Sequence, residues 1–240
     1  MIEALDPSVA RGRIATLDLL RGIAVLGIVA VNIAGFAGPP SATETPGLVH
    51  PATGIDEAAF AFVLFAFEGK MRALFSMLFG ASMLLFVEAA EARGRDGDIM
   101  QLRRLGWLLL IGWMHYVLLW WGDILFVYAV AGVIALALRR LPDRMLLVFA
   151  MLLFVGWHGV SMIDNLPLIA AEEHVRSGTA TAGEIETVRQ SLSAMVAKAA
   201  SDDAQARLGF LAMMADKLAK APLWPVVMTL YTICETLPLM

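Results

Sequence analysis

Long apolar segments separated by short polar segments dominate this chain. A helix that crosses a bilayer needs about 20 mostly apolar residues, because the hydrocarbon core is about 30 Å thick. The pattern therefore predicts an all-α protein, a polytopic bundle of transmembrane helices with five spans and the start of a sixth. The five predicted spans cover, approximately, residues 17–37, 58–87, 105–121, 124–138 and 145–163.

The second apolar segment is too long for one straight crossing, and Glu68, Gly69, Lys70 and Arg72 interrupt it. Two interpretations are open. The segment forms either one long tilted helix, or a short re-entrant piece that leads into a main span from about residue 70 to residue 87.

The polar segment 164–221 separates an N-terminal membrane domain, 1–163, from a last apolar segment, 222–240. Thr181 and Glu184 have the spacing of a capping box, and apolar residues follow at helical intervals. We expect an extracytoplasmic amphipathic segment that lies on the membrane or covers the outer mouth of the bundle. The chain stops inside the last apolar segment, which we interpret as the start of a truncated sixth span.

Positive charges in the connecting segments predict the orientation of the spans, because cytoplasmic loops are rich in Lys and Arg. Basic residues precede the first predicted span and follow the second and fourth. Residues 38–57 and 122–123 hold none. We therefore expect a multi-pass membrane protein with a cytoplasmic N-terminus and with His50 and Asp123 on the outer side.

Composition excludes several classes of protein. The chain is 59% hydrophobic and 17% charged, whereas soluble domains carry about a quarter charged residues. This excludes a soluble enzyme and makes the lipid bilayer the first partner. A net charge of −4 gives no basic field for nucleic acid. Cys234 is the single cysteine, and the four histidines lack ligand spacing, so we predict no metal site.

Charged residues inside the first span need a reason, because each costs about 2.5–3.5 kcal/mol at the centre of a membrane helix. Asp18 and Arg21 are three residues apart and can pair on one helix face. Asn32 lies eleven residues beyond Arg21, almost three turns, and so points the same way. These residues form either a structural pair with an interhelical hydrogen bond, or an anion site at the inner surface with a polar group deeper in the membrane.

The second and third spans carry further candidates. Lys70 and Arg72 either hold phosphate or another anion, or mark a helix break and reach toward the membrane surface. Arg104 and His115 are also eleven residues apart and share one face of the third span. A neutral imidazole at His115 can act as a general base, although a histidine held by one structural hydrogen bond is the commoner case.

Two more candidates lie between spans. Asp123 follows a glycine in a tight turn, where it can cap the fourth span or take part in chemistry. His50 in the first outer loop is either an exposed base or a solvated loop residue.

Three blocks of sequence resemble the YeiB family of bacterial membrane proteins. The first runs from Leu17 to Ala24 and continues to Asn32. The second is Lys70 with Leu74 to Ala81, and the third contains Gly112, His115 and Gly122 to Leu125. The blocks are collinear over residues 13–138. The YeiB family has no settled activity, and its members continue through several more spans, which favours truncation at Met240.

The first span is also similar to those of integral membrane acyltransferases, including heparan-α-glucosaminide N-acetyltransferase. In one large group of membrane O-acyltransferases a histidine stands eleven residues after the Arg. Here that residue is Asn32, so the histidine chemistry of that group does not transfer. The heparan enzyme resembles this chain in having Asn there, with its catalytic histidine in the following outer loop, where this chain has His50. His50 and His115 are thus both candidate bases.

The acyltransferase resemblance implies transfer from acetyl-CoA or another acyl-CoA to an extracytoplasmic glycan, lipid or small molecule. The alternatives are a small-solute transporter or exporter, and a membrane scaffold that binds a partner through residues 164–221. The candidate catalytic residues are His115, His50 and Asn32. The candidate substrate- or cofactor-binding residues are Asp18, Arg21, Lys70, Arg72, Arg104 and Asp123.

Overall fold

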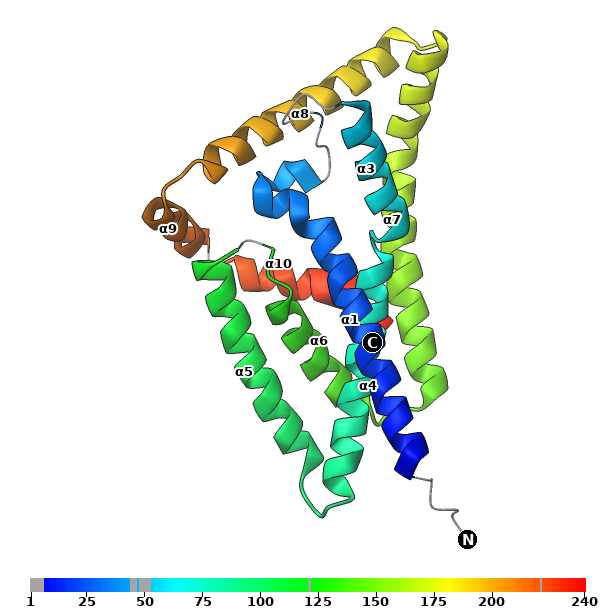
Figure 1. The fold of residues 1–240 in the computed structure, drawn as a ribbon. Helices are drawn as coiled ribbons and strands as arrows, with labels where there is room; N and C mark the ends of the chain where they lie inside the picture. The colour runs from blue at the N-terminus through cyan, green and yellow to red at the C-terminus, as the bar shows by residue number, and fades with distance from the viewer. Residues whose placement is uncertain (1–6, 44–46, 48–52, 121, 221) are drawn as a thin grey trace.

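The structure, a computed structural model, describes residues 7–43, 47, 53–120, 122–220 and 222–240. Every regular element among these residues is helical, which confirms the predicted fold class at that level (Figure 1).

The N-terminal part of the chain forms a bundle of helices that run roughly from top to bottom in Figure 1. Helix α1 packs on α4, α4 on α5, and α5 on α6, so neighbours in sequence are neighbours in space. The elements are α1 (Pro7–Ala37), a short 3₁₀ helix η1 (Pro40–Thr43), α3 (Gly54–Ala66), α4 (Lys70–Glu91), α5 (Gly97–Leu118) and α6 (Leu125–Leu138).

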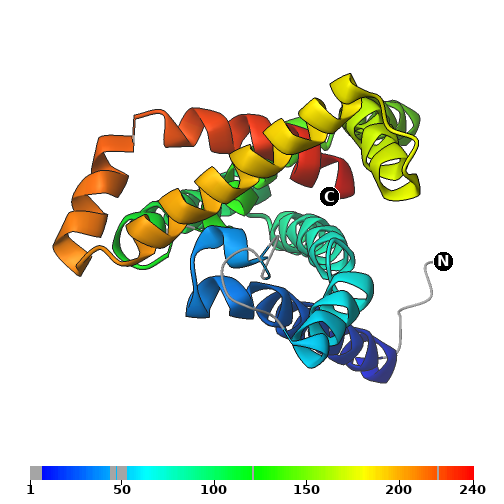
Figure 2. The same ribbon diagram turned by 90° about the horizontal axis from the view of Figure 1, so that it is seen from above.

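The remaining part of the chain lies beside and above this bundle (Figures 1 and 2). In Figure 1, α7 stands at one side, α8 crosses above the bundle to α9, and α10 returns across the axes of α5 and α6. Seen from above, α7 stands apart from α1 (Figure 2). The elements are α7 (Asp143–Ser177), α8 (Ala182–Ala206), α9 (Phe210–Lys220), α10 (Trp224–Tyr231), a π-helical turn η2 (Thr232–Thr236) and a 3₁₀ turn η3 (Leu237–Leu239).

The break in the second apolar segment lies at Gly69. Its φ of 71° falls in the left-handed region, which glycine adopts without the steric cost that a Cβ would add. Helix α3 therefore ends at Ala66 and α4 begins at Lys70. The break is the one that the polar residues predict, and it excludes a single uninterrupted helix.

The apolar core lies between α4, α5 and α6. Met83, Val87, Leu105 and Leu136 are buried there against one another. Within a bilayer such side chains stabilise the bundle through van der Waals packing, because lipid tails are as apolar as they are. This packed part of the bundle fixes the positions of α4 and α6, which carry Arg72 and Tyr128.

Three helical segments are long and apolar enough to cross a bilayer, namely Ala15–Phe36, Gly54–Glu91 and Asp143–Ser177. Helix α6 is a shorter apolar helix. These lengths are compatible with a membrane protein.

Helix α7 differs from the predicted fifth span, because it continues past residue 163 to Ser177. The polar residues after 163 include good helix formers such as Glu172 and Glu173, so the helix does not end where the apolar pattern ends. The predicted capping box is confirmed at the start of α8, where the side chains of Thr181 and Glu184 each bond the other's backbone N–H.

Candidate functional site

A cavity of about 320 Å³ opens between α1, α4, α6 and α10, and we call it the chamber. Its walls are largely apolar, with a few polar side chains that come from segments far apart in sequence. This combination is typical of small-molecule sites. The polar residues that line the chamber include Asn32, Glu68, Arg72, Asp123, Tyr128, Tyr231 and Thr236.

Asp123 connects the chamber to His115. The aspartate is 4% exposed, and its Oδ2 accepts a hydrogen bond of 2.8 Å from the backbone N–H of Phe126 in the first turn of α6. Its Oδ1 lies 3.0 Å from Nδ1 of His115, although these two atoms are not aligned as a hydrogen bond. Asp123 thus accepts a bond from a backbone N–H in the first turn of α6, although the N-cap position itself is Ile124, and its second oxygen lies beside the imidazole.

Gly112 allows this arrangement. A Cβ at this position would lie 2.4 Å from the backbone nitrogen of Phe126 and 3.0 Å from Oδ2 of Asp123. The start of α6 can therefore approach α5 closely only because residue 112 has no side chain. The glycine brings the carboxylate within reach of His115, which lies one turn further along α5.

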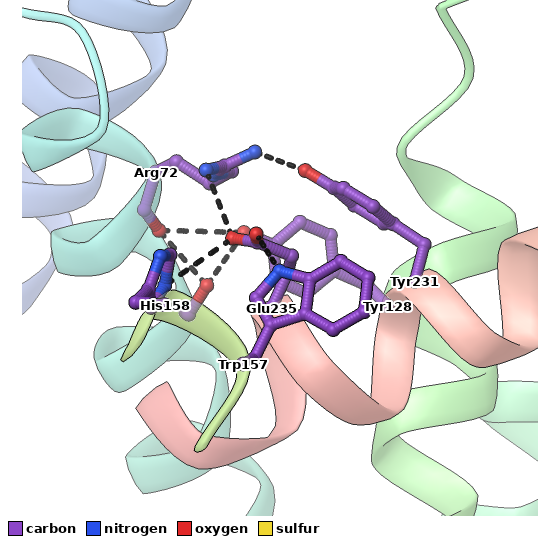
Figure 3. A network of polar contacts seen from close by, with 7 residues as sticks. Arg72, Tyr128, Trp157, His158, Tyr231 and Glu235 are labelled. Carbon is purple, nitrogen blue, oxygen red and sulfur yellow. Dashed lines mark hydrogen bonds and ion pairs between the residues drawn. The ribbon is translucent and has the colours of Figure 1, made fainter. Parts of the chain in front are cut away.

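A second group of polar side chains surrounds Arg72 (Figure 3). Its guanidinium donates hydrogen bonds to the hydroxyl of Tyr231 and to Oε2 of Glu235, the latter at 3.4 Å. Glu235 also accepts a bond of 2.6 Å from Nε1 of Trp157, and Nε2 of His158 lies 3.8 Å from its Oε2. The network joins α4, α7 and the C-terminal segment, and it places a carboxylate beside the arginine.

Tyr128 lies beneath this network in α6 and is almost wholly buried. Its hydroxyl lies 2.9 Å from Oγ of Ser76, which in turn donates to the carbonyl of Arg72 at 2.9 Å. Phe75 and Phe79 contact the other side of the tyrosine ring, with centroid distances of 5.0 and 5.2 Å.

A second cavity of about 440 Å³ lies beyond these phenylalanines, and we call it the vestibule. Arg21 donates to Oδ1 of Asp18 at 2.8 Å and to the hydroxyl of Ser82. The guanidinium of Arg104 lies over the ring of Phe86, 4.1 Å from its centroid. The polar residues that line the vestibule are Arg21, Ser82, Gln101 and Arg104.

The four cations predicted to hold an anion thus lie in three places. Arg21 and Arg104 meet in the vestibule, and Arg72 lies in the chamber. Lys70 lines neither cavity, is exposed and donates to the carbonyl of Phe65 at 2.6 Å.

Two of the candidate catalytic residues come together. Asn32 lines the chamber with Asp123, and His115 contacts Asp123 from outside the lining. His50 lies outside the described residues. Within the described ranges, no three His, Cys, Asp or Glu side chains gather as a metal site requires.

Sequence reasoning missed the partners of Arg72. Glu235 could have been recognised from the sequence, because it is the one charged residue in the apolar segment 223–240. An ionisable group in such a segment is a candidate for function. Trp157 and Tyr231 have no such signal, since nothing in their local sequence pattern shows what they face.

The chain is similar to three uncharacterized proteins. It is 34% identical over 182 residues to YxaH of Bacillus subtilis (strain 168), and 32% identical over 173 residues to YeiB of Escherichia coli (strain K12). It is 36% identical over 167 residues to an uncharacterized 39.9 kDa protein of Bacillus acidopullulyticus. Homologues of this chain thus include YeiB and YxaH. This supports the YeiB-like resemblance of the sequence.

The matches cover 74%, 72% and 69% of this chain, but 45%, 43% and 46% of YxaH, YeiB and the 39.9 kDa protein. The chain therefore spans less than half of the length of these relatives. No family model and no solved structure matches the chain.

Proposed function

We propose that this YeiB-like protein transfers an acyl group from acetyl-CoA or another acyl-CoA to a hydroxyl or amine on a glycan, lipid or small molecule across the membrane. The observation that carries the proposal is the pair His115–Asp123, in which a buried carboxylate of the chamber lies 3.0 Å from an imidazole. A carboxylate can itself act as a general base, and a neighbouring imidazole can share the proton that it takes.

The chemistry assigned to the pair is removal of one proton. The acceptor's hydroxyl or amine attacks the thioester carbonyl, and its proton passes to the Asp123–His115 pair. The carbon–sulfur bond then breaks, and the proton goes to the departing sulfur, which leaves as the free thiol of CoA. Because Asp123 lines the chamber and His115 does not, the carboxylate is the member that faces the acceptor.

Two side chains in the chamber suit the charge that develops in this step. The amide of Asn32 can donate a hydrogen bond to the oxyanion of the tetrahedral intermediate. The guanidinium of Arg72, whose charge Glu235 partly offsets, adds a positive potential on the same cavity.

The vestibule suits the phosphate end of the donor. Arg21 and Arg104 both line it, and guanidinium groups bind phosphate through paired hydrogen bonds. The distribution of Lys and Arg along the sequence supports a cytoplasmic N-terminus in the bacterial plasma membrane, which places Arg21 and Arg104 on the side where acyl-CoA is made. Segment 164–221 is then extracytoplasmic.

The test uses inside-out membrane vesicles that carry the complete reading frame, with labelled acetyl-CoA added outside. Label should enter a lipid, glycan or lumenal fraction in the parent. His115→Ala and Arg21→Ala should abolish the transfer while the amount of protein in the membrane stays the same. His50→Ala tests the other candidate base, and His174→Ala is the matched control, since His174 lies at an exposed helix junction with its own carboxylate.

Normal transfer in both His115→Ala and Arg21→Ala would contradict the proposal. The alternative is a small-solute transporter or exporter, which the presence of two polar cavities on opposite sides of one aromatic wall favours. It predicts solute flux without CoA-dependent label.

A further inference from the structure

The chamber and the vestibule are separated by aromatic rings. Tyr128 lines the chamber, and Phe75 and Phe79 line the vestibule. The ring of Tyr128 contacts each phenylalanine ring, with centroid distances of 5.0 Å to Phe75 and 5.2 Å to Phe79. The wall between the two cavities is therefore formed by side chains alone at this point, with no helix backbone between the rings.

Tyr128 is held in this wall at one end only. Its hydroxyl meets Oγ of Ser76 at 2.9 Å and the carbonyl of Arg72 at 3.5 Å, and both residues lie on α4. The rest of the ring is held by ring contacts. Opening the wall therefore requires these rings to move and the contacts of the Tyr128 hydroxyl to break, but it breaks no hydrogen bond within a helix backbone.

The two cavities also differ in chemistry. The vestibule presents two guanidinium groups and no carboxylate among its lining residues. The chamber mixes Arg72 with the carboxylates of Glu68 and Asp123. A long molecule with an anionic head and an uncharged arm would match both cavities if the wall opened, with its head in the vestibule and its arm in the chamber.

We propose that Tyr128 is the gate of a closed passage between the vestibule and the chamber, and that an elongated anionic donor reaches the chamber through it. This inference rests on the proposed acyl transfer for the nature of the donor. The gate itself rests on the geometry of the wall. An aromatic constriction of this kind blocks water and ions while its rings are in contact.

The test measures access to the chamber and needs no acyl donor. Cys234, the single cysteine, is replaced by Ser, and Val31, which lines the chamber, is replaced by Cys. The probe is 2-sulfonatoethyl methanethiosulfonate, an anionic thiol reagent that does not cross lipid. Its reaction rate with Val31→Cys is measured in right-side-out and in inside-out vesicles of the full-length protein.

In the parent, the reagent should label the cysteine quickly from one face and slowly from the other, because the wall is closed. Tyr128→Ala should raise the slow-face rate by about ten-fold or more, since the wall loses its central ring. Tyr128→Leu, which keeps apolar volume but is narrower, should raise it less. Tyr128→Phe keeps the ring and should stay within about two-fold of the parent.

The fast-face rate is the internal control, because it reports an intact chamber in every variant. A parent that is labelled equally quickly from both faces would overturn the gate. So would slow-face rates that stay at the parent value in both Tyr128→Ala and Tyr128→Leu. If Tyr128 controls access as expected but no label is transferred from acetyl-CoA, the passage is supported and the proposed acyl transfer is contradicted. The two proposals can therefore be tested separately.

Discussion

Two of the histidine–carboxylate pairs differ in how far their side chains are exposed. His115 lies 3.0 Å from Asp123; the side chain of Asp123 is fully buried, whereas 30% of the His115 side chain is exposed. His174 lies 2.6 Å from Glu184 at the junction of α7 and α8, where 48% and 29% of the two side chains are exposed. By distance alone, the exposed pair is the closer one.

The comparison shows that contact between a histidine and a carboxylate does not define a site. The exposed pair stabilises a helix start, since Glu184 completes the capping box of Thr181. The backbone N–H of Thr181 and the side chain of His174 lower the pKa of Glu184 to about 2, so it stays ionised in ordinary buffers. The buried pair instead borders a cavity that holds Asn32. Burial and an adjacent cavity distinguish the two.

The largest expected effect comes from neutralising the buried carboxylate. Asp123→Asn keeps an oxygen that can accept the N–H of Phe126, but it removes the carboxylate that takes the proton beside His115. We expect acyl transfer to fall by about 10²–10⁴-fold, the usual range for loss of general acid–base catalysis. The measurement is label transfer per mole of membrane-inserted protein.

Glu184→Gln is the matched change at the exposed pair, and it should leave transfer within about two-fold of the parent, since loss of a solvated ion pair changes little. Equal losses in the two variants would mean that the buried pair has no role of its own in transfer.

A second difference between the two regions is the closeness of helix packing. A Cβ at Gly112 would meet the backbone of Phe126, whereas a Cβ at Gly159 in α7 meets nothing within 4 Å. Gly112→Ala should lower the free energy of unfolding by about 1–3 kcal/mol, the usual cost of overpacking. Gly159→Ala should preserve or slightly raise it, because alanine is the better helix former.

Thermal unfolding in detergent micelles measures both glycine variants. A fall in Tm for Gly159→Ala as large as that for Gly112→Ala would show that α7 packs as closely as α5 does.

The sequence predicts local features in both regions. Helical apolar segments and the polar interruption at Gly69 in the bundle, and the capping box at Thr181 in the outer part, all follow from local rules of spacing and backbone geometry. These rules do not depend on which other helices pack against the segment. The extension of α7 to Ser177 does not follow from the apolar pattern, because helix propensity outlasts hydrophobicity there.

The candidate site shows the same division. The sequence pointed to Asn32, Arg72, His115 and Asp123 as costly polar groups, and three of these line the chamber. It did not show that Arg21 and Arg104 would share a cavity while Lys70 lies apart. Such groupings depend on how helices rotate against one another, and the spacing within one helix does not contain that information.

A smaller effect is expected at the Arg72 network, which connects the bundle to α7. Glu235→Gln keeps an oxygen to accept the bond from Trp157 but removes the charge that faces Arg72. We expect stability to fall by about 1 kcal/mol, since Arg72 is more than a third exposed and solvent screens the pair. Thermal unfolding measures this. A larger fall in the free energy of unfolding than for Gly112→Ala would show that this network stabilises the fold more than the α5–α6 contact does.

The smallest effect is the pH response of the exposed pair. Because the pKa of Glu184 is lowered to about 2, its ionised form stabilises the capping box. That contribution is complete above the ordinary glutamate pKa, and it is lost as the pH falls toward 2. Hydrogen exchange of the first amides of α8, corrected for intrinsic rates, should therefore be slow at pH 6 and faster at pH 3. In Glu184→Gln the corrected rate should be nearly the same at both. If the exchange rate still depends on pH in Glu184→Gln, the pH dependence comes from another group. The charge of Glu184 would then make no contribution to the stability of the α8 N-terminus.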